Sequence, residues 1–408
     1  MKILILGAGI TGLSTGRLLQ GKAEVTILEQ DAEIGGIAKT RTVDGATYHT
    51  VGGHCFNSKY PEVLDFVFSL MPKDKWHLTQ RLSMINMGNY EISYPIEYAV
   101  KEIYQQDPEL AYDIAIDFMT AKDADDPANL EEWFREKFGD ALCDRYFIPY
   151  NAKIWGREPR KMDYRWVQDK LPLPDKRGFL KSLVDTNRDT MPHSSFYYPN
   201  TNNQKTLIET LAEGQNIICN MPVKSIQKVE GKWIVNGTFE ADEIISTLPL
   251  DLLPSYIEGV PSIILEQASL LRYNRVSNVF WTSQITPKTW TYQPSSGTLF
   301  HRYIHIGSFF LPTAGYTITE CIGEHSFEEM IESGRKDSFL IHPLDYNVSE
   351  RAYVVFDENR DKAVHAILSW LDREGIKSIG RFGQWEYYNM DICIKQSMET
   401  VKEMMKSI

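Results

Sequence analysis

The feature that most constrains the fold is a glycine-rich turn near the amino terminus. Residues 2–6 (KILIL) are long enough for one buried strand, Gly-Ala-Gly-Ile-Thr-Gly follows at 7–12, and residues 13–19 have the pattern of a helix. A second apolar strand at 23–28 ends at Glu29. A strand, a Gly-x-Gly-x-x-Gly turn, a helix, a strand and an acid follow in the order of a dinucleotide-binding site.

Each glycine of this turn has its own role in such a site. Gly7 permits the tight turn, Gly9 leaves room for a pyrophosphate, and Gly12 lets the helix pack against the strand. The helix amino terminus offers N–H groups to the phosphates, and Glu29 can accept hydrogen bonds from ribose hydroxyls. The alternative is an ordinary glycine-rich connection. The predicted cofactor contacts here are Gly7, Gly9, Ile10, Thr11, Gly12, Glu29 and Gln30.

A second glycine pair indicates which cofactor binds. Gly35 and Gly36 follow the acid closely, and Ile37 comes next. An NAD-only domain has no need of a glycine pair there, whereas the ribityl chain and pyrophosphate of a flavin pass such a segment. We therefore expect FAD rather than NAD as the tightly held cofactor, with contacts to Gly35, Gly36 and Ile37.

Composition excludes several classes of protein. The chain has 408 residues, 43% of them apolar, which is typical of two or three globular domains. The net charge of −12 argues against nucleic acid as a partner. The five cysteines are scattered without a Cys-x-x-Cys pair, so we expect neither disulfides nor zinc, and a reducing, cytoplasmic setting. No apolar run has the ~20 residues of a transmembrane span.

One strand–turn–helix unit cannot make a doubly wound sheet. We expect the remaining strands to come from residues 223–246 and from the carboxyl-terminal part of the chain, and we expect Val223 to contact the cofactor. Helical patterns fill much of 61–145, and short aromatic and β-branched runs fill 278–319. We predict an α/β fold built on a discontinuous Rossmann-type FAD-binding domain. The predicted division is 1–60, 205–250 and 376–408 for that domain, 61–204 for an inserted mainly helical domain, and 251–375 for an inserted antiparallel sheet domain.

Four stretches resemble a known family. They are 52–60 (GGHCFNSKY), 149–170 (PYNAKIWGREPRKMDYRWVQDK), 299–306 (LFHRYIHI) and 380–391 (GRFGQWEYYNMD). Together they resemble UDP-galactopyranose mutase, within the flavin amine oxidase and protoporphyrinogen oxidase superfamily. The resemblance implies that a nucleotide sugar is interconverted between pyranose and furanose forms through a reduced-flavin N5 adduct. It also implies that the reduced form of FAD is active, with NAD(P)H as a possible external reductant.

The resemblance assigns roles to particular residues. His54 follows Gly52 and Gly53, so it can lie against the flavin ring, as the matching histidine does in the similar enzymes. Arg302 matches the arginine that grips the diphosphate, for which a forked guanidinium is suited. The alternatives are a core or surface histidine for His54, and for Arg302 a strand arginine paired with a surface acid.

Further matches concern the substrate. Asn151 and Trp155 correspond to residues lining the nucleotide-sugar pocket, although Trp155 would serve equally well in a core. The hydroxyls of Tyr353 and Tyr387 correspond to diphosphate contacts. Lys170 stands where eukaryotic-type mutases carry a second diphosphate arginine, so the charge is kept and the fork is lost. The alternative for this lysine is a solvated loop.

Two segments complete the predicted site. Tyr-Pro-Ile-Glu at 94–97 resembles a stretch that contacts uracil, but Glu97 replaces the expected amide, and a carboxylate cannot donate its hydrogen bond. The second segment opens the final helix, whose N–H groups would stabilise an anionic reduced flavin; the alternative is a plain capped helix. Its predicted cofactor contacts are Gly380, Arg381, Asn389, Met390 and Asp391.

Three functions are compared. A mutase needs cations at the diphosphate positions, and Arg302 and Lys170 supply them. An oxidoreductase of the amine oxidase or protoporphyrinogen oxidase type is the alternative, and it would need an apolar cage or a wide apolar cleft. An inactive flavin-binding module has no direct support. The sequence carries no signal for an oligomeric state or for the identity of the sugar.

Overall fold

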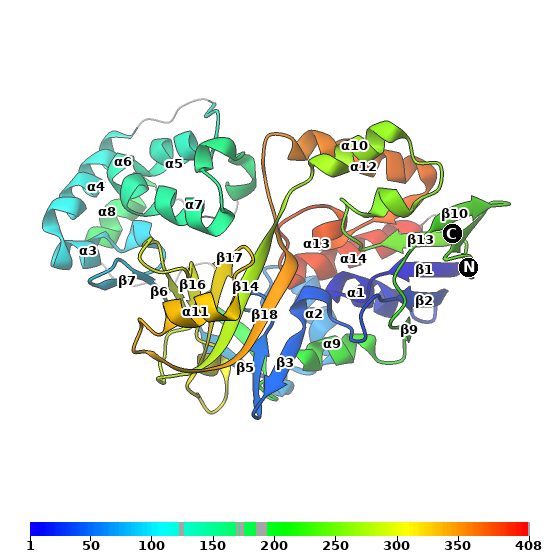
Figure 1. Ribbon diagram of the computed structural model, residues 1–408, viewed down its shortest axis with the longest axis horizontal. Coiled ribbons are helices and arrows are strands. Elements are labelled where there is room, and N and C mark those ends of the chain that lie inside the picture. Colours follow the sequence, from blue (N-terminus) through cyan, green and yellow to red (C-terminus); the bar gives the residue numbers. More distant parts are fainter. Residues whose placement is uncertain (122–125, 169–170, 172–174, 185–193, 407–408) are drawn as a thin grey trace.

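The computed structural model describes residues 1–121, 126–168, 171, 175–184 and 194–406. A helical lobe lies at one end of the molecule, a parallel sheet covered by helices lies at the other, and a large sheet lies between them (Figure 1). Lys170 is outside the described residues. In the part of the chain that is described, no helix combines the length and the apolar character that crossing a membrane requires.

The amino-terminal strand is central to a five-stranded parallel sheet of order β19-β13-β1-β2-β9. Alternate residues of β1 point to opposite faces: Leu4 and Leu6 belong to one core cluster, Ile3 and Ile5 to another. Both faces are buried, which explains why the strand is an unbroken apolar run. The strands are β1 (Lys2–Leu6), β2 (Glu24–Leu28), β9 (Asn216–Ile218), β13 (Glu243–Ser246) and β19 (Ile376–Ser378).

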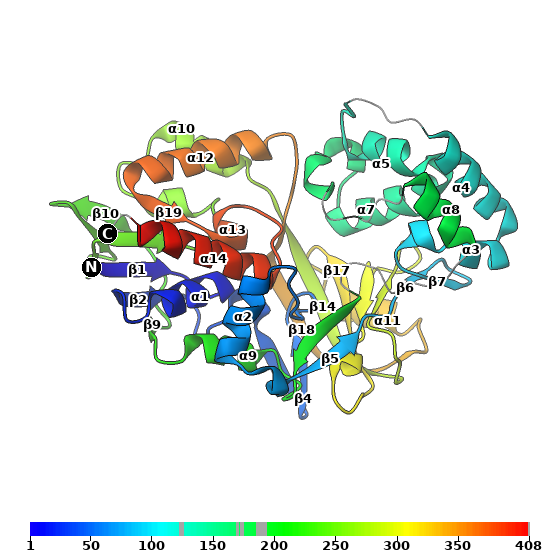
Figure 2. The ribbon, with the colours of Figure 1, turned by 180° about the vertical axis from the view of Figure 1, so that it is seen from behind.

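Helices from distant parts of the chain cover the two faces. In Figure 1 α10 and α12 lie above β1 and β13, and α1 and α9 lie below; Figure 2 shows α14 beside α1 from behind. Leu13 of α1 and Ile394 of α14 share one core cluster, in which α14 packs along α1. The helices are α1 (Ile10–Leu19), α2 (Pro61–Leu70), α9 (Lys205–Ala212), α10 (Ser262–Leu270), α12 (Arg360–Glu374), α13 (Gly380–Gly383) and α14 (Met390–Met404).

The expectation for residues 223–246 was wrong in part. Only β13 of this stretch joins the parallel sheet; β10 (Ile226–Val229), β11 (Lys232–Val235) and β12 (Phe239–Ala241) form a separate antiparallel sheet. The reason is the turn between β10 and β11, where Glu230 and Gly231 both have positive φ, 50° and 80°. Such a two-residue turn makes an antiparallel hairpin, whereas parallel neighbours need a long crossover.

The large sheet has seven strands in the order β18-β14-β17-β16-β15-β6-β7, antiparallel except between β15 and β6. Its strands are β6 (Ser83–Asn86), β7 (Glu91–Ser93), β14 (Tyr273–Ser283), β15 (Trp290–Tyr292), β16 (Arg302–Ile304), β17 (Tyr316–Ile322) and β18 (Leu340–Val354). Strands β6 and β7 come from the segment predicted to be mainly helical. The α/β class is confirmed, and the division into domains at the stated boundaries stays a prediction. Smaller ribbons pair β3 (Thr40–Val43) with β4 (Ala46–His49) and β5 (Trp76–Gln80) with β8 (Ser195–Pro199).

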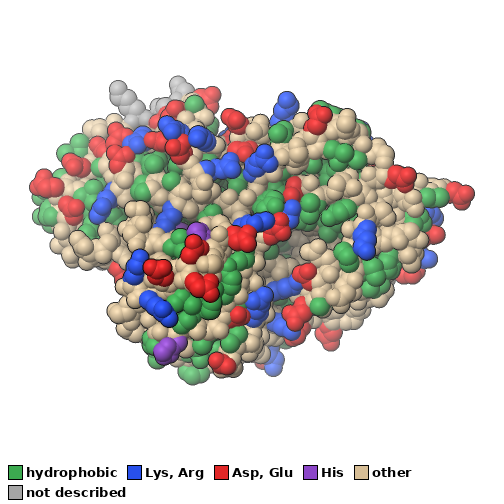
Figure 3. All heavy atoms as spheres, in the orientation of Figure 1, with side chains coloured by type: hydrophobic (Ala, Val, Ile, Leu, Met, Phe, Trp, Pro, Cys, Tyr) green, Lys and Arg blue, Asp and Glu red, His purple; other side chains and the backbone are tan. Residues whose placement is uncertain are grey.

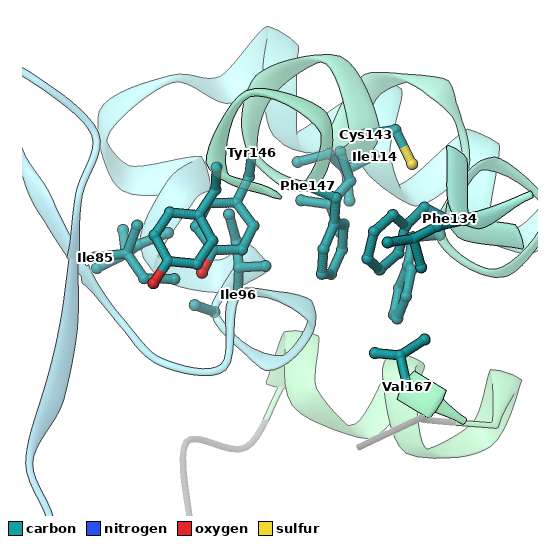
Figure 4. Packing of buried hydrophobic residues seen from close by; sticks show 14 of the residues in the cluster. Ile85, Ile96, Ile114, Phe134, Cys143, Tyr146, Phe147 and Val167 are labelled. Carbon is teal, nitrogen blue, oxygen red and sulfur yellow. The ribbon is translucent and has the colours of Figure 1, made fainter. Parts of the chain in front are cut away.

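The helical lobe is held together by an aromatic core (Figure 4). The rings of Phe134 and Phe147 stack with centroids 4.8 Å apart, and Tyr146 stacks on Tyr150 at 5.3 Å. Polar caps start its helices: the Asp107 side chain accepts the Leu110 N–H at the start of α4. The helices are α3 (Val100–Gln106), α4 (Pro108–Thr120), α5 (Leu130–Phe138), α6 (Asp140–Leu142), α7 (Ile148–Trp155) and α8 (Lys176–Val184).

Candidate functional site

A cavity of about 1380 Å³ runs from the carboxyl ends of β1 and β2 to the large sheet. This exceeds the roughly 300–1,000 Å³ of an ordinary small-molecule pocket, so it has room for a cofactor and a substrate together. Charged side chains gather around the hollow at the centre of one face (Figure 3). The predicted residues that line it are Gly7, Gly9, Ile10, Thr11, Glu29, Gln30, Gly35, Gly36, Ile37, Gly52, Gly53, His54, Val223, Arg302, Tyr353, Arg381, Tyr387, Asn389, Met390 and Asp391.

The amino-terminal turn has the shape of a phosphate cradle. Gly7 has a φ of 100°, and a Cβ there would overlap the Thr247 hydroxyl. A Cβ on Gly12 would overlap the carbonyl oxygen of Gly7, so Gly12 lies behind the cavity wall and serves helix packing. A Cβ on Gly9 would meet no atom closer than 3.9 Å, and Gly9 caps α1 without a side-chain hydrogen bond. The turn therefore leaves open backbone and N–H groups toward the cavity.

Glu29 braces this turn as well as lining the cavity. Its carboxylate accepts the N–H of Ala8 at 2.8 Å through one oxygen and the N–H of Asp31 at 3.0 Å through the other. The side chain is buried, at 5% exposure. A carboxylate oxygen can accept more than one hydrogen bond, so a ribose hydroxyl remains a compatible partner.

The second glycine pair packs directly against the first turn. Gly35 N–H donates to the Ala8 carbonyl at 2.8 Å, and a Cβ on Gly36 would lie 3.2 Å from the Gly9 Cα. Gly36 also has a φ of 57°. Two backbone segments therefore meet at the cavity with no side chain between them.

The start of the last helix opens on the same cavity. Asn389 caps α14 without a side-chain hydrogen bond, and the Ser397 hydroxyl donates to the Thr11 carbonyl at 3.0 Å. Gly380 does not line the cavity; its φ is 85°, and a Cβ there would overlap Thr11. The amino termini of α1 and α14 thus both bring positive potential to one space. Arg381 adds a guanidinium held by the carbonyls of Tyr388 (3.0 Å) and Ala352 (2.9 Å).

His54 is presented to the cavity as a neutral imidazole. Burial and the charge of Arg381 lower the pKa of His54 to about 4. Its backbone N–H donates to Nδ1 of His49 at 2.7 Å, and His49 Nε2 is 2.9 Å from the Tyr198 hydroxyl, so the backbone is anchored. Nε2 of His54 is buried and finds no hydrogen-bond partner among the described residues. An orphaned ring nitrogen in a cavity wall is suited to a polar group of a bound molecule.

Arg302 lies in a buried charge network that the sequence did not predict. Its Nε pairs with the Glu320 carboxylate and a terminal nitrogen donates to the Tyr353 hydroxyl. Glu320 has 0% exposure and also accepts the Gly52 N–H at 3.0 Å. Burial would raise the pKa of Glu320, but Arg302 and His301 hold it below its ordinary value, so the carboxylate is ionised. The signal available in the sequence was a single acid in the otherwise uncharged strand β17.

The predicted tyrosines form a stacked pair beside this network. Tyr353 and Tyr387 have ring centroids 5.7 Å apart and planes 12° apart, with the Arg381 guanidinium 4.5 Å from the Tyr387 centroid. Trp155 lies behind them, 6.3 Å from Tyr387 between centroids, and donates from Nε1 to Asn151 at 3.2 Å. Asn151 and Trp155 do not line the cavity.

Glu97 lies outside the cavity wall, in the core of the helical lobe. It is 2% exposed, and its Oε1 has no hydrogen-bond partner among the described residues. Burial raises the pKa of Glu97 to about 8. A protonated carboxyl group donates a hydrogen bond as an amide does, so the expected loss of a donor at this position does not follow.

The geometry can be compared with known proteins. A family model of the NAD(P)-binding Rossmann-like domain matches residues 5–70. Over its whole length the chain superposes on a crystal structure of reduced UDP-galactopyranose mutase, covering 96% of that chain with a TM-score of 0.87 at 20% identity. This chain has the UDP-galactopyranose mutase fold. The resemblance inferred from the four sequence stretches is confirmed.

Two further proteins are similar. Wild-type putrescine oxidase bound to putrescine superposes over 100% of this chain and 99% of its own, with a TM-score of 0.63 at 15% identity. In sequence, the chain is 27% identical to dTDP-fucopyranose mutase from Escherichia coli over 168 residues, which are 40% of this chain and 43% of that protein. The match therefore spans less than half of that relative, and the mutase fold is shared with an oxidase.

Proposed function

We propose that the chain is a flavin-dependent mutase that interconverts the pyranose and furanose forms of a nucleoside-diphosphate sugar. The observation that carries the proposal is the position of Arg302, between the neutral His54 on the cofactor side and the Tyr353–Tyr387 pair in one cavity. A guanidinium beside hydroxyls is suited to a diphosphate that leaves and returns. The sequence similarity to a mutase of dTDP-fucopyranose supports the same substrate class.

FAD is the proposed cofactor, and the residues present fit it. Gly9 and the glycine pair at 35–36 form a side-chain-free cradle, and the orphaned Nε2 of His54 lies further along the same cavity. When reduced, FAD supplies a nucleophile for the anomeric carbon without net oxidation. The amino terminus of α14 and Arg381 would stabilise the negative charge of the reduced form. NAD(P)H as reductant and a cytoplasmic location, which the free cysteines favour, belong to the proposal.

In this proposal the residues of the cavity have different roles in binding the substrate and the cofactor. Arg302, Tyr353 and Tyr387 bind and orient the diphosphate, while Glu320 keeps the guanidinium in place. His54 stays uncharged, so it adds no positive charge that would weaken a nucleophile. The remaining substrate residues proposed from the sequence are Asn151, Trp155 and Lys170, of which Asn151 and Trp155 act by supporting Tyr387.

Amine oxidation is the alternative, because putrescine oxidase shares the fold. The lining of the cavity argues against it. Arg302, Arg381 and Arg81 all face the cavity, whereas an amine is best held by an apolar aromatic cage.

The test is conversion of UDP-galactose and of dTDP-fucopyranose by the FAD-loaded protein, with products separated by chromatography. We expect a furanose product after reduction by dithionite and none with oxidised flavin. Arg302→Ala should abolish conversion and weaken UDP or dTDP binding by about a hundredfold while FAD stays bound. Arg275→Ala is the matched control, because Arg275 is also a strand arginine paired with an acid, Glu324, but lies outside the cavity lining. Turnover by oxidised protein, or equal affinities in wild type and Arg302→Ala, would refute the proposal.

A further inference from the structure

Arg81 is a cavity-lining guanidinium to which the proposed function assigns no role in binding or catalysis. It precedes β6, and its Nε donates to the Ser83 hydroxyl while a terminal nitrogen donates to the Tyr292 hydroxyl, both at 3.0 Å. The guanidinium carbon lies 4.8 Å from the Trp290 ring centroid and 5.8 Å from that of Tyr94. Two hydrogen bonds and two rings therefore hold the group in one orientation.

No acid in the described part of the chain matches the charge of Arg81. Among the residues that the structure describes, no carboxylate forms an ion pair with it, and two of its five N–H donors are committed to side chains. Three other arginines of the same cavity are ion-paired: Arg41 with Asp345, Arg302 with Glu320, and Arg351 with Asp251. The fourth, Arg381, is held by the backbone carbonyls of Tyr388 and Ala352. A partly buried cation that lacks a counter-charge favours an anionic ligand.

The position of Arg81 relates it to the diphosphate site. A Cβ on Gly52 would lie 3.5 Å from Arg302, and a Cβ on Gly53 would lie 3.0 Å from Trp290, which in turn contacts Arg81. The glycine pair before His54 therefore lies between the two arginines. Across β15 the register pairs Arg302 with Tyr292 and Tyr292 with Ile85, so Arg81 lies four residues before the position opposite Arg302. Its guanidinium nevertheless reaches the hydroxyl of Tyr292, the strand neighbour of Arg302, so both arginines approach the same part of β15.

We propose that Arg81 binds a carboxylate on the sugar, so that the substrate is an acidic nucleotide sugar such as a uronic acid derivative. The inference rests on the proposed function, in which Arg302 holds the diphosphate. A pyranose ring separates its anomeric diphosphate from a carboxylate at its sixth carbon, so one substrate can engage both arginines. The free donors of Arg81 match the two oxygens of a carboxylate, whereas a neutral hexose would leave the charge unmatched.

The test is calorimetric titration of the FAD-loaded protein with UDP, UDP-galactose and UDP-galacturonic acid. We expect wild type to bind UDP-galacturonic acid at least about tenfold more tightly than UDP-galactose. Arg81→Met, which keeps length and removes charge, should abolish that preference and change UDP affinity less than about twofold. Arg81→Lys should keep part of the preference, because it keeps the charge and loses the fork. Arg275→Met, outside the cavity lining, should match wild type.

Several results would overturn the inference. Equal affinities for the two sugars in wild type refute it, and so does an equal loss for all three ligands in Arg81→Met, which would indicate a structural role. A shifted flavin potential with three unchanged affinities would assign Arg81 to the cofactor instead. If Arg81→Met does not load FAD, the affinities of wild type and Arg81→Lys for the two sugars still test the inference. UDP binding without a carboxylate preference refutes only the role of Arg81, whereas absence of any UDP or dTDP binding refutes the proposed function.

Discussion

The carboxylate of Glu320 and the guanidinium of Arg302 form an ion pair whose side chains are 0% and 13% exposed. The same carboxylate accepts the N–H of Gly52, two residues before His54. The arginine proposed to bind the diphosphate and the segment expected to face the flavin are therefore held by one side chain. A shift of either is transmitted to the other, because both hydrogen-bond to the same rigid group.

Replacing Glu320 with glutamine should destabilise the protein and change how stability responds to ligand. The change leaves the Arg302 charge without a partner, so we expect the free energy of unfolding to fall by about 3 kcal/mol in urea titrations. Adding UDP or dTDP should raise the free energy of unfolding more in Glu320→Gln than in wild type, because the phosphates replace the negative charge that the substitution removes. Glu209→Gln, an exposed acid paired with Lys205 at 3.7 Å, is the control. Equal stability of wild type and Glu320→Gln would show that the pair is unimportant.

Glu97 should make the protein less stable as pH rises. Its pKa is raised to about 8 in the folded state, so the folded state binds a proton that the unfolded state releases above about pH 4.5. Stability should fall between pH 5 and 8 by up to about 1.4 kcal/mol per pH unit. Glu97→Gln should remove this slope and be more stable than wild type at pH 8 by roughly 4 kcal/mol. Denaturation at both pH values measures this, with the exposed Glu109→Gln as control; parallel slopes in all three proteins would contradict it.

His54 should remain neutral across the physiological range. Its pKa of about 4 means that the ring gains a proton only under acidic conditions. Nitrogen NMR of labelled protein, with the resonance assigned by its absence in His54→Gln, should show an uncharged ring from pH 8 to about pH 5. A titration midpoint near 6.5 would contradict the burial seen here.

Two glycines of the amino-terminal turn should respond differently to alanine. Gly9→Ala adds a methyl group that meets only the Gly36 Cα, at an ordinary contact distance of 3.9 Å, so the fold should be kept within about 2 °C in Tm while FAD affinity falls at least about tenfold. Gly12→Ala adds a methyl group that overlaps the Gly7 carbonyl, so the free energy of unfolding should fall by about 3 kcal/mol. Differential scanning calorimetry and FAD fluorescence separate the two effects. Tight FAD binding by Gly9→Ala would remove the cradle assignment.

Local patterns of the sequence predicted the elements of the amino-terminal wall of the cavity well. The order of strand, glycine turn, helix and acid is contained in residues 2–29, and the structure builds those elements in that order. The hairpin of β10 and β11 was misplaced because one pair of turn residues with positive φ, Glu230 and Gly231, decides its direction. A strand period alone does not show which sheet a strand joins.

The charged side of the cavity was less predictable. The register of β16 against β17 places Arg302 opposite Glu320. The folded chain also brings the N–H of Gly52, 268 residues from Glu320 in sequence, to the same carboxylate. Arg81 acquires its place through Trp290 and Tyr292 on another strand. Such contacts depend on the folded sheet, and no spacing along the chain reports them.

The docking of α14 on α1, through the Ser397 hydroxyl and the Thr11 carbonyl, has a consequence for biosynthesis. The wall that contains Thr11 leaves the ribosome well before the wall that contains Ser397, which lies 386 residues later in the chain. A nascent chain without α14 contains only one of the two walls of the cofactor-binding site. Cofactor loading therefore follows translation, and chains truncated before the last helix should accumulate as apoprotein.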